Sequence, residues 1–190
     1  MSQQPLFATH SLPEGFSYAA EFLTTDEERA ALSGIAALEL REAQYKEYTA
    51  KRRVASFGAG YDFDANELMP APVMAPFLLP LRDKAAAWAG EDPAEFNYAL
   101  VAEYAPGTQL GWHRDVPQFE SILGISFGTT CTMRLRRYPP AEHEPVYRLE
   151  LAPRSVYALR DEARWGWQHA IAPTPGLRYS ITFRSRRKTP

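Results

Sequence analysis

A histidine and an aspartate stand two positions apart, as His113 and Asp115, in the stretch Leu110-Gly-Trp-His-Arg-Asp-Val116. Residues i and i+2 of an extended strand point to the same face, so the imidazole and the carboxylate are expected to converge. A second histidine would complete the face of two histidines and one carboxylate that holds non-haem Fe(II) and leaves other coordination positions open. Chance supplies this spacing in many proteins, so the rest of the chain must provide the third ligand.

The chain has only four histidines, which limits the choice of a third ligand. His10 lies in a polar lead-in, and His143 lies in an acidic, proline-rich loop that we expect to be solvated. His169 follows Trp165-Gly-Trp-Gln within a late strand pattern and is the best candidate. The alternative is that His113 and His169 are ordinary, partly buried histidines, which is the more common situation for a single histidine.

The last strand pattern of the chain carries two arginines on one face. Polar residues alternate here with apolar ones, in the order Arg178, Tyr179, Ser180, Ile181, Thr182, Phe183, Arg184. Two fixed guanidinium groups on one face suit a dicarboxylate, because each can form a forked pair with a carboxylate. The alternative is a strand whose polar face meets water.

Two helices and a series of short strands must position these residues. Thr25 and Glu28 fit a capping box, and apolar residues at helical spacing carry that helix to about Leu40. Residues 74–89 form a second helix pattern with Gly90 as its C-terminal cap. Residues 51–61 are expected to be extended with a turn near Gly58, and residues 66–72 are read as a linker.

From Phe96 onward the pattern is β. Gly and Pro turns separate the predicted strands, which is typical of a sandwich or barrel. These strands cover residues 97–104, 109–115, 121–127, 129–138, 146–151, 155–159, 165–171 and 178–184.

Length and composition favour an ordinary globular protein. The 190 residues suit one domain, and the formal net charge of −2 means that any contact with nucleic acid must rest on local basic patches. The single cysteine, Cys131, excludes an internal disulfide and a zinc site of clustered thiolates. We see no signal peptide and no stretch long enough to span a membrane, so we expect a cytoplasmic protein.

Residues 97–184 resemble the catalytic core of the AlkB-type 2-oxoglutarate and Fe(II)-dependent dioxygenases. The segment before the core, Lys51-Arg-Arg-Val-Ala-Ser-Phe-Gly-Ala-Gly-Tyr61, resembles more loosely the family's substrate-covering segment. The resemblance within the core covers nearly half the chain in the order and approximate spacing of the family, and it rests on Tyr104-Ala-Pro-Gly-Thr-Gln-Leu-Gly-Trp-His-Arg-Asp115, Ile125-Ser-Phe-Gly128, Glu162-Ala-Arg164 leading to His169, and Arg178-Tyr-Ser-Ile-Thr-Phe-Arg184.

The resemblance implies a mainly β protein with flanking helices (α+β), folded as a double-stranded β-helix, which is a jelly-roll variant. Within one domain, residues 1–95 would supply helices and the substrate-covering segment, and residues 96–190 the catalytic core. Fe(II), 2-oxoglutarate and O2 would be the cofactors. The resemblance implies these site residues: His113, Asp115 and His169 as iron ligands, Tyr104 and Arg178 at the distal carboxylate of 2-oxoglutarate, Arg184 near its keto-acid end, and Ser180 and Ala102 where some members carry asparagine and another side-chain amide.

AlkB-type enzymes most often act on alkylated nucleobases, so the resemblance implies oxidative demethylation of N-alkylated DNA or RNA, with release of formaldehyde, succinate and CO2. Such a base must be flipped out of a duplex and gripped by an aromatic or basic lid. We expect Lys51, Arg52, Arg53, Phe57 and Tyr61 to form that lid. We place Trp112 and Arg164, with Arg53, Phe57 and Tyr61, among the substrate-contacting residues. The enzyme is expected to be a monomer without membrane contact.

Other functions stay open at this stage. The substrate could be a protein side chain or a small molecule, because some relatives act on proteins. A binding module with a vestigial site is a further alternative, as is a jelly-roll cupin, which has no need of the Arg178 and Arg184 pair. Arg114, between the two metal-ligand candidates, should point to the opposite face of its strand, and its role is open.

Overall fold

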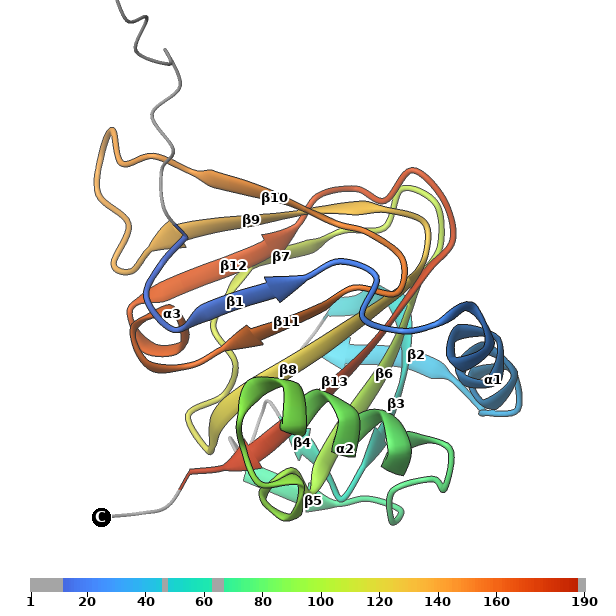
Figure 1. The fold of residues 1–190 in the computed structure, drawn as a ribbon. Helices are drawn as coiled ribbons and strands as arrows, with labels where there is room; N and C mark the ends of the chain where they lie inside the picture. Colours follow the sequence, from blue (N-terminus) through green and yellow to red (C-terminus); the bar gives the residue numbers. More distant parts are fainter. Residues whose placement is uncertain (1–11, 46–47, 63–66, 188–190) are drawn as a thin grey trace, which may run out of the picture.

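The computed structural model describes residues 12–45, 48–62 and 67–187, and it is built mainly from two antiparallel sheets that face each other (Figure 1). The larger sheet has the strand order β1-β11-β8-β13-β6-β3-β2. Its strands are β1 (Phe16–Ala19), β2 (Arg41–Tyr45), β3 (Tyr48–Phe57), β6 (Tyr98–Tyr104), β8 (Phe119–Gly128), β11 (Val156–Leu159) and β13 (Arg178–Arg186).

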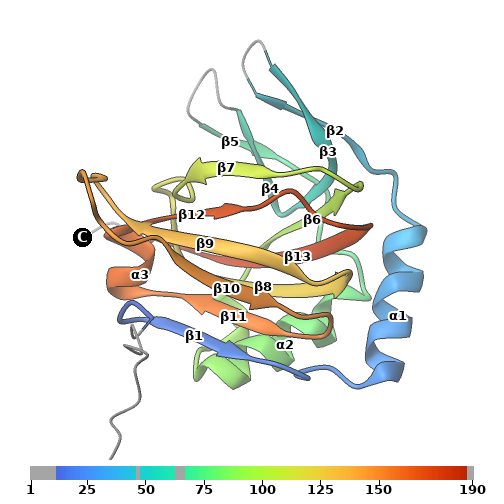
Figure 2. The same ribbon diagram turned by 90° about the horizontal axis from the view of Figure 1, so that it is seen from above.

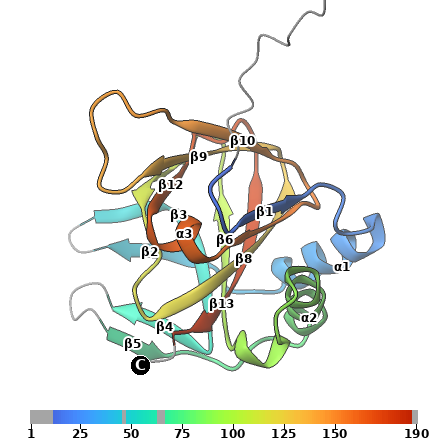
Figure 3. The same cartoon turned by 60° about the vertical axis from the view of Figure 1, so that its left-hand side comes forward.

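The smaller sheet has the order β10-β9-β12-β7 and lies over the β11-β8-β13-β6 part of the larger one (Figure 1). A separate hairpin, β4-β5, projects on the same side of the molecule as the β2-β3 hairpin (Figures 2 and 3). The remaining strands are β4 (Ala59–Asp62), β5 (Glu67–Pro70), β7 (Leu110–His113), β9 (Cys131–Arg137), β10 (Tyr147–Leu151) and β12 (Trp167–Ile171). This arrangement is the expected double-stranded β-helix, and the strand β5 replaces the linker predicted there.

Helices α1 (Thr25–Ala36) and α2 (Leu78–Ala89) cover the outer face of the larger sheet (Figure 3). The capping box of α1 is formed by Thr24 and Glu27, one residue earlier than predicted, and the helix ends four residues short of Leu40. Gly90 caps α2 in the left-handed conformation, as expected. A short helix, α3 (Asp161–Trp165), and the 3-10 turn η1 (Pro93–Glu95) were not predicted. Among the described residues, no helix is long and apolar enough to cross a membrane.

Strand alternation divides the apolar core into two layers. Ile181 and Phe183 of β13 face outward and pack, with β6 and β8, against α1 and α2. Burying such a side chain contributes roughly 1.5–3 kcal/mol. A second layer between the two sheets includes Met133, Leu135 and Trp167. The polar residues of β13 therefore point between the sheets rather than into water.

Candidate functional site

His113, Asp115 and His169 come together between the two sheets, with their ligand atoms all within 4.8 Å of one another. Strands β7 and β12 are neighbours, and His113 is paired directly with His169 in their ladder. The two imidazole centroids are 4.2 Å apart, and Nε2 of His169 lies 3.6 Å from Oδ2 of Asp115. Among the described residues this is the group of histidines and acidic residues that could hold a metal ion.

Asp115 lies beyond the end of β7, so the expectation that it shares a strand face with His113 was wrong in detail. Its carboxylate is placed by tertiary contacts instead: Nε of Arg184 on β13 donates to Oδ1 at 2.8 Å. With Oδ1 engaged, Oδ2 is the oxygen that faces His169. Arg184 was expected at the keto-acid end of 2-oxoglutarate, and the structure places it against a metal-ligand candidate.

The charges of the three side chains suit a divalent metal. Burial lowers the pKa of His113 and lowers the pKa of His169 to about 3, so both rings are neutral ligands at neutral pH. Burial alone raises the pKa of Asp115, but nearby positive charge, Arg184 first, outweighs it and holds the pKa below its usual range. Nδ1 of His113 lies 2.9 Å from the carbonyl oxygen of Gly111, which leaves Nε2 free for a metal. Two neutral imidazoles and one carboxylate are the donor set of non-haem Fe(II).

Arg178 lies deep between the sheets and is only 1% exposed. Its Nε donates to the hydroxyl of Ser126 at 3.2 Å, and its guanidinium lies 4.9 Å from the centre of the Tyr104 ring. Its buried Nη1 has no hydrogen-bond partner among the described residues. A buried cation with a free donor is costly unless an anion completes the site. The water-facing interpretation of this strand is therefore wrong, and the site fits a bound carboxylate.

Two further residues of the predicted cosubstrate site line up with Arg178. Tyr104 of β6 pairs with Arg178 across the ladder, and Ser180 pairs with Ala102. All of them are buried. The two positions that depart from some family members, Ala102 and Ser180, are therefore direct neighbours.

Tyr157 is a buried tyrosine in this region that sequence reasoning did not select. It lies on β11 and packs directly over Gly124 of β8, where a Cβ atom would collide with its ring. Burial, followed by the negative charge of Asp115, raises the pKa of its hydroxyl, so the phenol is neutral. Its inward direction follows from alternation with Val156 and Ala158, which belong to the outer core layer.

Two of the predicted lid residues on β3, Arg53 and Phe57, lie on the face of the strand that points away from the metal-ligand candidates. Arg53 forms a two-bonded ion pair with Glu103 on the outer face of the larger sheet, and its side chain is 52% exposed. Phe57 is buried in the outer core layer. Arg52 points inward instead, with Nη1 3.5 Å from the hydroxyl of Tyr104 and its buried Nε without a partner among the described residues. Alternation along β3 puts Arg52 on one face and Arg53, Ala55 and Phe57 on the other, so Arg52 rather than Arg53 faces Tyr104.

The other predicted substrate residues are placed elsewhere. Tyr61 lies on β4, but its side chain is outside the described residues. Trp112 turns to the outer face of the smaller sheet, where the guanidinium groups of Arg134 and Arg136 lie 5.2 and 4.3 Å from its ring centre. Trp112 directly precedes His113, so alternation turns the two side chains to opposite faces. The register shift in the β7-β12 ladder lets both Leu110 and His113 face inward.

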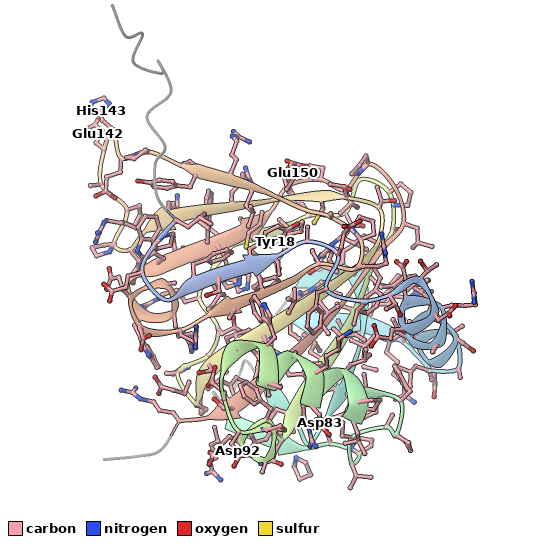
Figure 4. All side chains as sticks on the ribbon, in the orientation of Figure 1. Tyr18, Asp83, Asp92, Glu142, His143 and Glu150 are labelled. Atoms are coloured by element: carbon pink, nitrogen blue, oxygen red, sulfur yellow. The ribbon has the colours of Figure 1, made fainter. Side chains whose placement is uncertain are left out.

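Arg164 is 3% exposed, and its guanidinium contacts the protein backbone. Its Nη2 donates to the carbonyls of Asp115 and Val116, after β7, and of Phe119, the first residue of β8. Arg114 lies on the outside, stacked 3.9 Å from the centre of the Tyr138 ring. His143 and Glu142 lie at the tip of the loop between β9 and β10, away from both sheets (Figure 4), as expected for a solvated histidine.

Comparisons with known proteins agree with this geometry. A family model described as "2OG-Fe(II) oxygenase superfamily" matches residues 16–184. An uncharacterized protein, L905, of Acanthamoeba polyphaga mimivirus is 28% identical over 196 residues, which cover 90% of this chain and 84% of the viral protein.

Two solved structures share the fold. OsALKBH1 superposes with a TM-score of 0.70 at 16% identity, covering 93% of this chain and 99% of that one. A prolyl-4-hydroxylase from Pseudomonas putida superposes with a TM-score of 0.60, also at 16% identity, covering 92% of this chain and 94% of that one. At these identities the likeness establishes the fold alone.

Proposed function

The chain belongs to the 2OG-Fe(II) oxygenase superfamily, and we propose that it oxidatively removes N-alkyl groups from the nucleobases of DNA or RNA. As a member of this family it is a dioxygenase that uses Fe(II), 2-oxoglutarate and O2. Bound at the site, these supply the oxidation of a substrate C–H bond to an alcohol, with succinate and CO2 as the other products. An N-methyl group hydroxylated in this way breaks down to formaldehyde and the free amine.

His113, Asp115 and His169 would hold the iron, and the observation that carries the proposal is their convergence beside two inward-facing arginines. The neutral imidazoles offer their lone pairs without first losing a proton. Arg184 turns the carboxylate of Asp115 so that Oδ2 faces the metal side. With three protein ligands, the iron would keep other coordination positions open for cosubstrate and O2.

Arg178, Tyr104 and Ser180 would hold the distal carboxylate of 2-oxoglutarate. The unpartnered Nη1 of Arg178 supports this assignment, because a carboxylate oxygen is the acceptor it lacks. The hydroxyl of Tyr104 adds a donor from the neighbouring strand. Arg184 stays near the keto-acid end through its contact with Asp115.

A basic patch on the smaller sheet supports a nucleic-acid substrate. We call it the Trp112 patch, and it consists of Trp112, Arg134, Arg136 and Arg148 on the outer face. Arg148 stands directly opposite Arg134, and like charges in that position destabilise a sheet unless an anion relieves them. Phosphates beside an aromatic ring are such a partner. The overall fold of the AlkB homologue OsALKBH1 also supports this proposal.

Hydroxylation of a protein side chain or a small molecule is the second candidate. It is favoured by the superposition on the Pseudomonas putida prolyl-4-hydroxylase. Two of the lid residues expected to grip a base, Arg53 and Phe57, also face away from the metal cluster. A base would therefore be held by other groups, such as Arg52, whose Nη1 lies 3.5 Å from the Tyr104 hydroxyl.

The test is turnover on a panel of methylated DNA and RNA oligonucleotides with Fe(II), 2-oxoglutarate and ascorbate. We expect formaldehyde and the unmodified base in equal amounts, and neither from the His113→Ala variant. Succinate production without any change in the panel would reject the nucleobase and favour the second candidate. Unchanged Fe(II) binding in His113→Ala would reject the metal assignment itself.

A further inference from the structure

Arg164 contributes an unusual set of contacts for a buried arginine in a short helix. One nitrogen, Nη2, donates to the carbonyl oxygens of Asp115 at 3.1 Å, Val116 at 2.8 Å and Phe119 at 2.9 Å. Asp115 and Val116 belong to the segment that immediately follows β7, and Phe119 is the first residue of β8. Buried carbonyls outside a ladder need donors, and here one side chain supplies those of Asp115 and Val116.

Further bonds join the same two segments. Nη1 of Arg114 donates to the carbonyl oxygen of Trp165 at 2.9 Å, and Nε1 of Trp165 donates to Glu120 at 2.9 Å. The guanidinium of Arg164 also lies 4.2 Å from the centre of the Trp165 ring. Hydrogen bonds from side chains of both segments therefore join the segment after β7 to the helix α3.

The first of these segments contains Asp115, and the two segments adjoin the strands that carry His113 and His169. His113 ends β7 and Asp115 follows it, while α3 ends two residues before β12, the strand that carries His169. The ladder between β7 and β12 stops at the His113–His169 pair, so Asp115 has no strand partner. Its backbone is held by Arg164 and its side chain by Arg184.

We propose that Arg164 is a positioning residue for the metal site, which fixes the backbone of Asp115 against the segment that carries His169. It touches neither substrate nor cosubstrate in this role. The inference rests on the metal site described above, and it does not depend on which substrate is oxidised.

The test is metal affinity, measured without substrate or turnover. Metal-free protein is titrated with Co(II), followed by its visible absorption, and with Mn(II) by calorimetry. Loss of a residue that orients a ligand typically weakens metal binding by about 10–100-fold. We expect a loss of metal affinity in this range for Arg164→Met and a smaller loss for Arg164→Lys, which keeps a charged donor but not the guanidinium group. Arg29→Met, on the exposed surface of α1, is the matched control and should bind both metals as the unaltered protein does.

Two results would overturn the proposal. Unchanged metal affinity together with a raised KM for substrate would make Arg164 a substrate contact. Unchanged metal affinity with a lowered Tm would make its role only structural. If Arg164→Met fails to fold, Arg164→Lys and the exposed Arg114→Met decide: both should weaken Co(II) binding, and normal binding in both overturns the proposal. Failure of the nucleobase assay would leave these titrations unaffected.

Discussion

Arg184 donates from Nε to Oδ1 of Asp115 at 2.8 Å, and it does so across the interior, from the last strand to the segment after β7. The side chains are 15% and 6% exposed, so this is a largely buried ion pair. The contact determines which oxygen of Asp115 is available to a metal. It also links the cosubstrate strand to the metal site.

Replacing Arg184 should destabilise the protein more than a surface pair would. In Arg184→Met the Asp115 carboxylate stays buried without its partner, which costs about 3–5 kcal/mol. We expect a loss of this order in the free energy of urea unfolding of the metal-free protein. The double variant Arg184→Met/Asp115→Asn should recover part of it, and equal losses in the single and double variants would contradict this account.

Removal of Arg178 should weaken 2-oxoglutarate binding and leave the metal in place. A hydrogen bond to a charged group contributes about 1.5–3 kcal/mol, so Arg178→Met should raise the Kd for 2-oxoglutarate by about 10–100-fold. Calorimetry with the Mn(II)-loaded protein measures this without turnover. Unaltered 2-oxoglutarate affinity would remove Arg178 from the proposed cosubstrate site.

The metal-free protein should lose stability in mild acid. Burial lowers the pKa of His169 to about 3 and lowers that of His113, whereas the unfolded chain titrates near 6.5. Below about pH 6.5 the unfolded chain binds more protons than the folded protein, so the free energy of unfolding decreases as the pH is lowered. His169 should contribute up to about 1.4 kcal/mol per pH unit between roughly pH 6 and 4, and His113 should add a loss in the same direction.

Urea unfolding at a series of pH values checks this behaviour. His169→Gln removes one of the two titrating rings and should flatten the slope. A metal-free protein whose stability is constant from neutral pH to about pH 5 would show that the two rings titrate normally in the folded state.

Neighbouring arginines on β3 should behave differently because alternation places them on opposite faces. Arg52→Met removes the cation beside Tyr104 and should lower kcat/KM by about tenfold or more, the loss expected for one charged hydrogen bond. Arg53→Met removes only the surface pair with Glu103 and should leave kcat/KM unchanged, with at most about 1 kcal/mol lost in stability. A larger loss of kcat/KM in Arg53→Met than in Arg52→Met would contradict the observed placement of the two arginines on opposite faces of β3.

The Trp112 patch should bind the phosphate backbone without regard to sequence. Arg134→Gln and Arg148→Gln should each weaken oligonucleotide binding and reduce the slope of log K against log salt by about 1. Fluorescence anisotropy at several salt concentrations measures both quantities, with Arg29→Gln as the surface control. Identical slopes in all variants would show that the patch does not contact nucleic acid.

Much of the site could be predicted because its signals are local. The scarcity of histidines left His169 as the best third ligand, and alternation along residues 178–184 put two arginines on one face. Along β3 the same alternation separates Arg52 from Arg53, but it does not show which of them faces the site. Apolar residues lie on both faces, Val54 with Arg52 and Ala55 and Phe57 with Arg53.

Other features depend on contacts between segments far apart in the chain. No local pattern indicates that β7 ends at His113, that the β7-β12 register shifts, or that α3 forms before β12. The role of Arg164 follows from these, because its acceptors lie about fifty residues earlier in the chain.

By itself, the sequence determined which residues are the metal-ligand candidates, the β-rich architecture and the polar face of the last strand, because residue type and periodicity are local properties of the chain. Only the tertiary structure decided how Asp115 is held, and it did so through Arg164 and Arg184. An aspartate outside a ladder has no preferred direction of its own. Its geometry is set by whichever buried donors the fold brings to it.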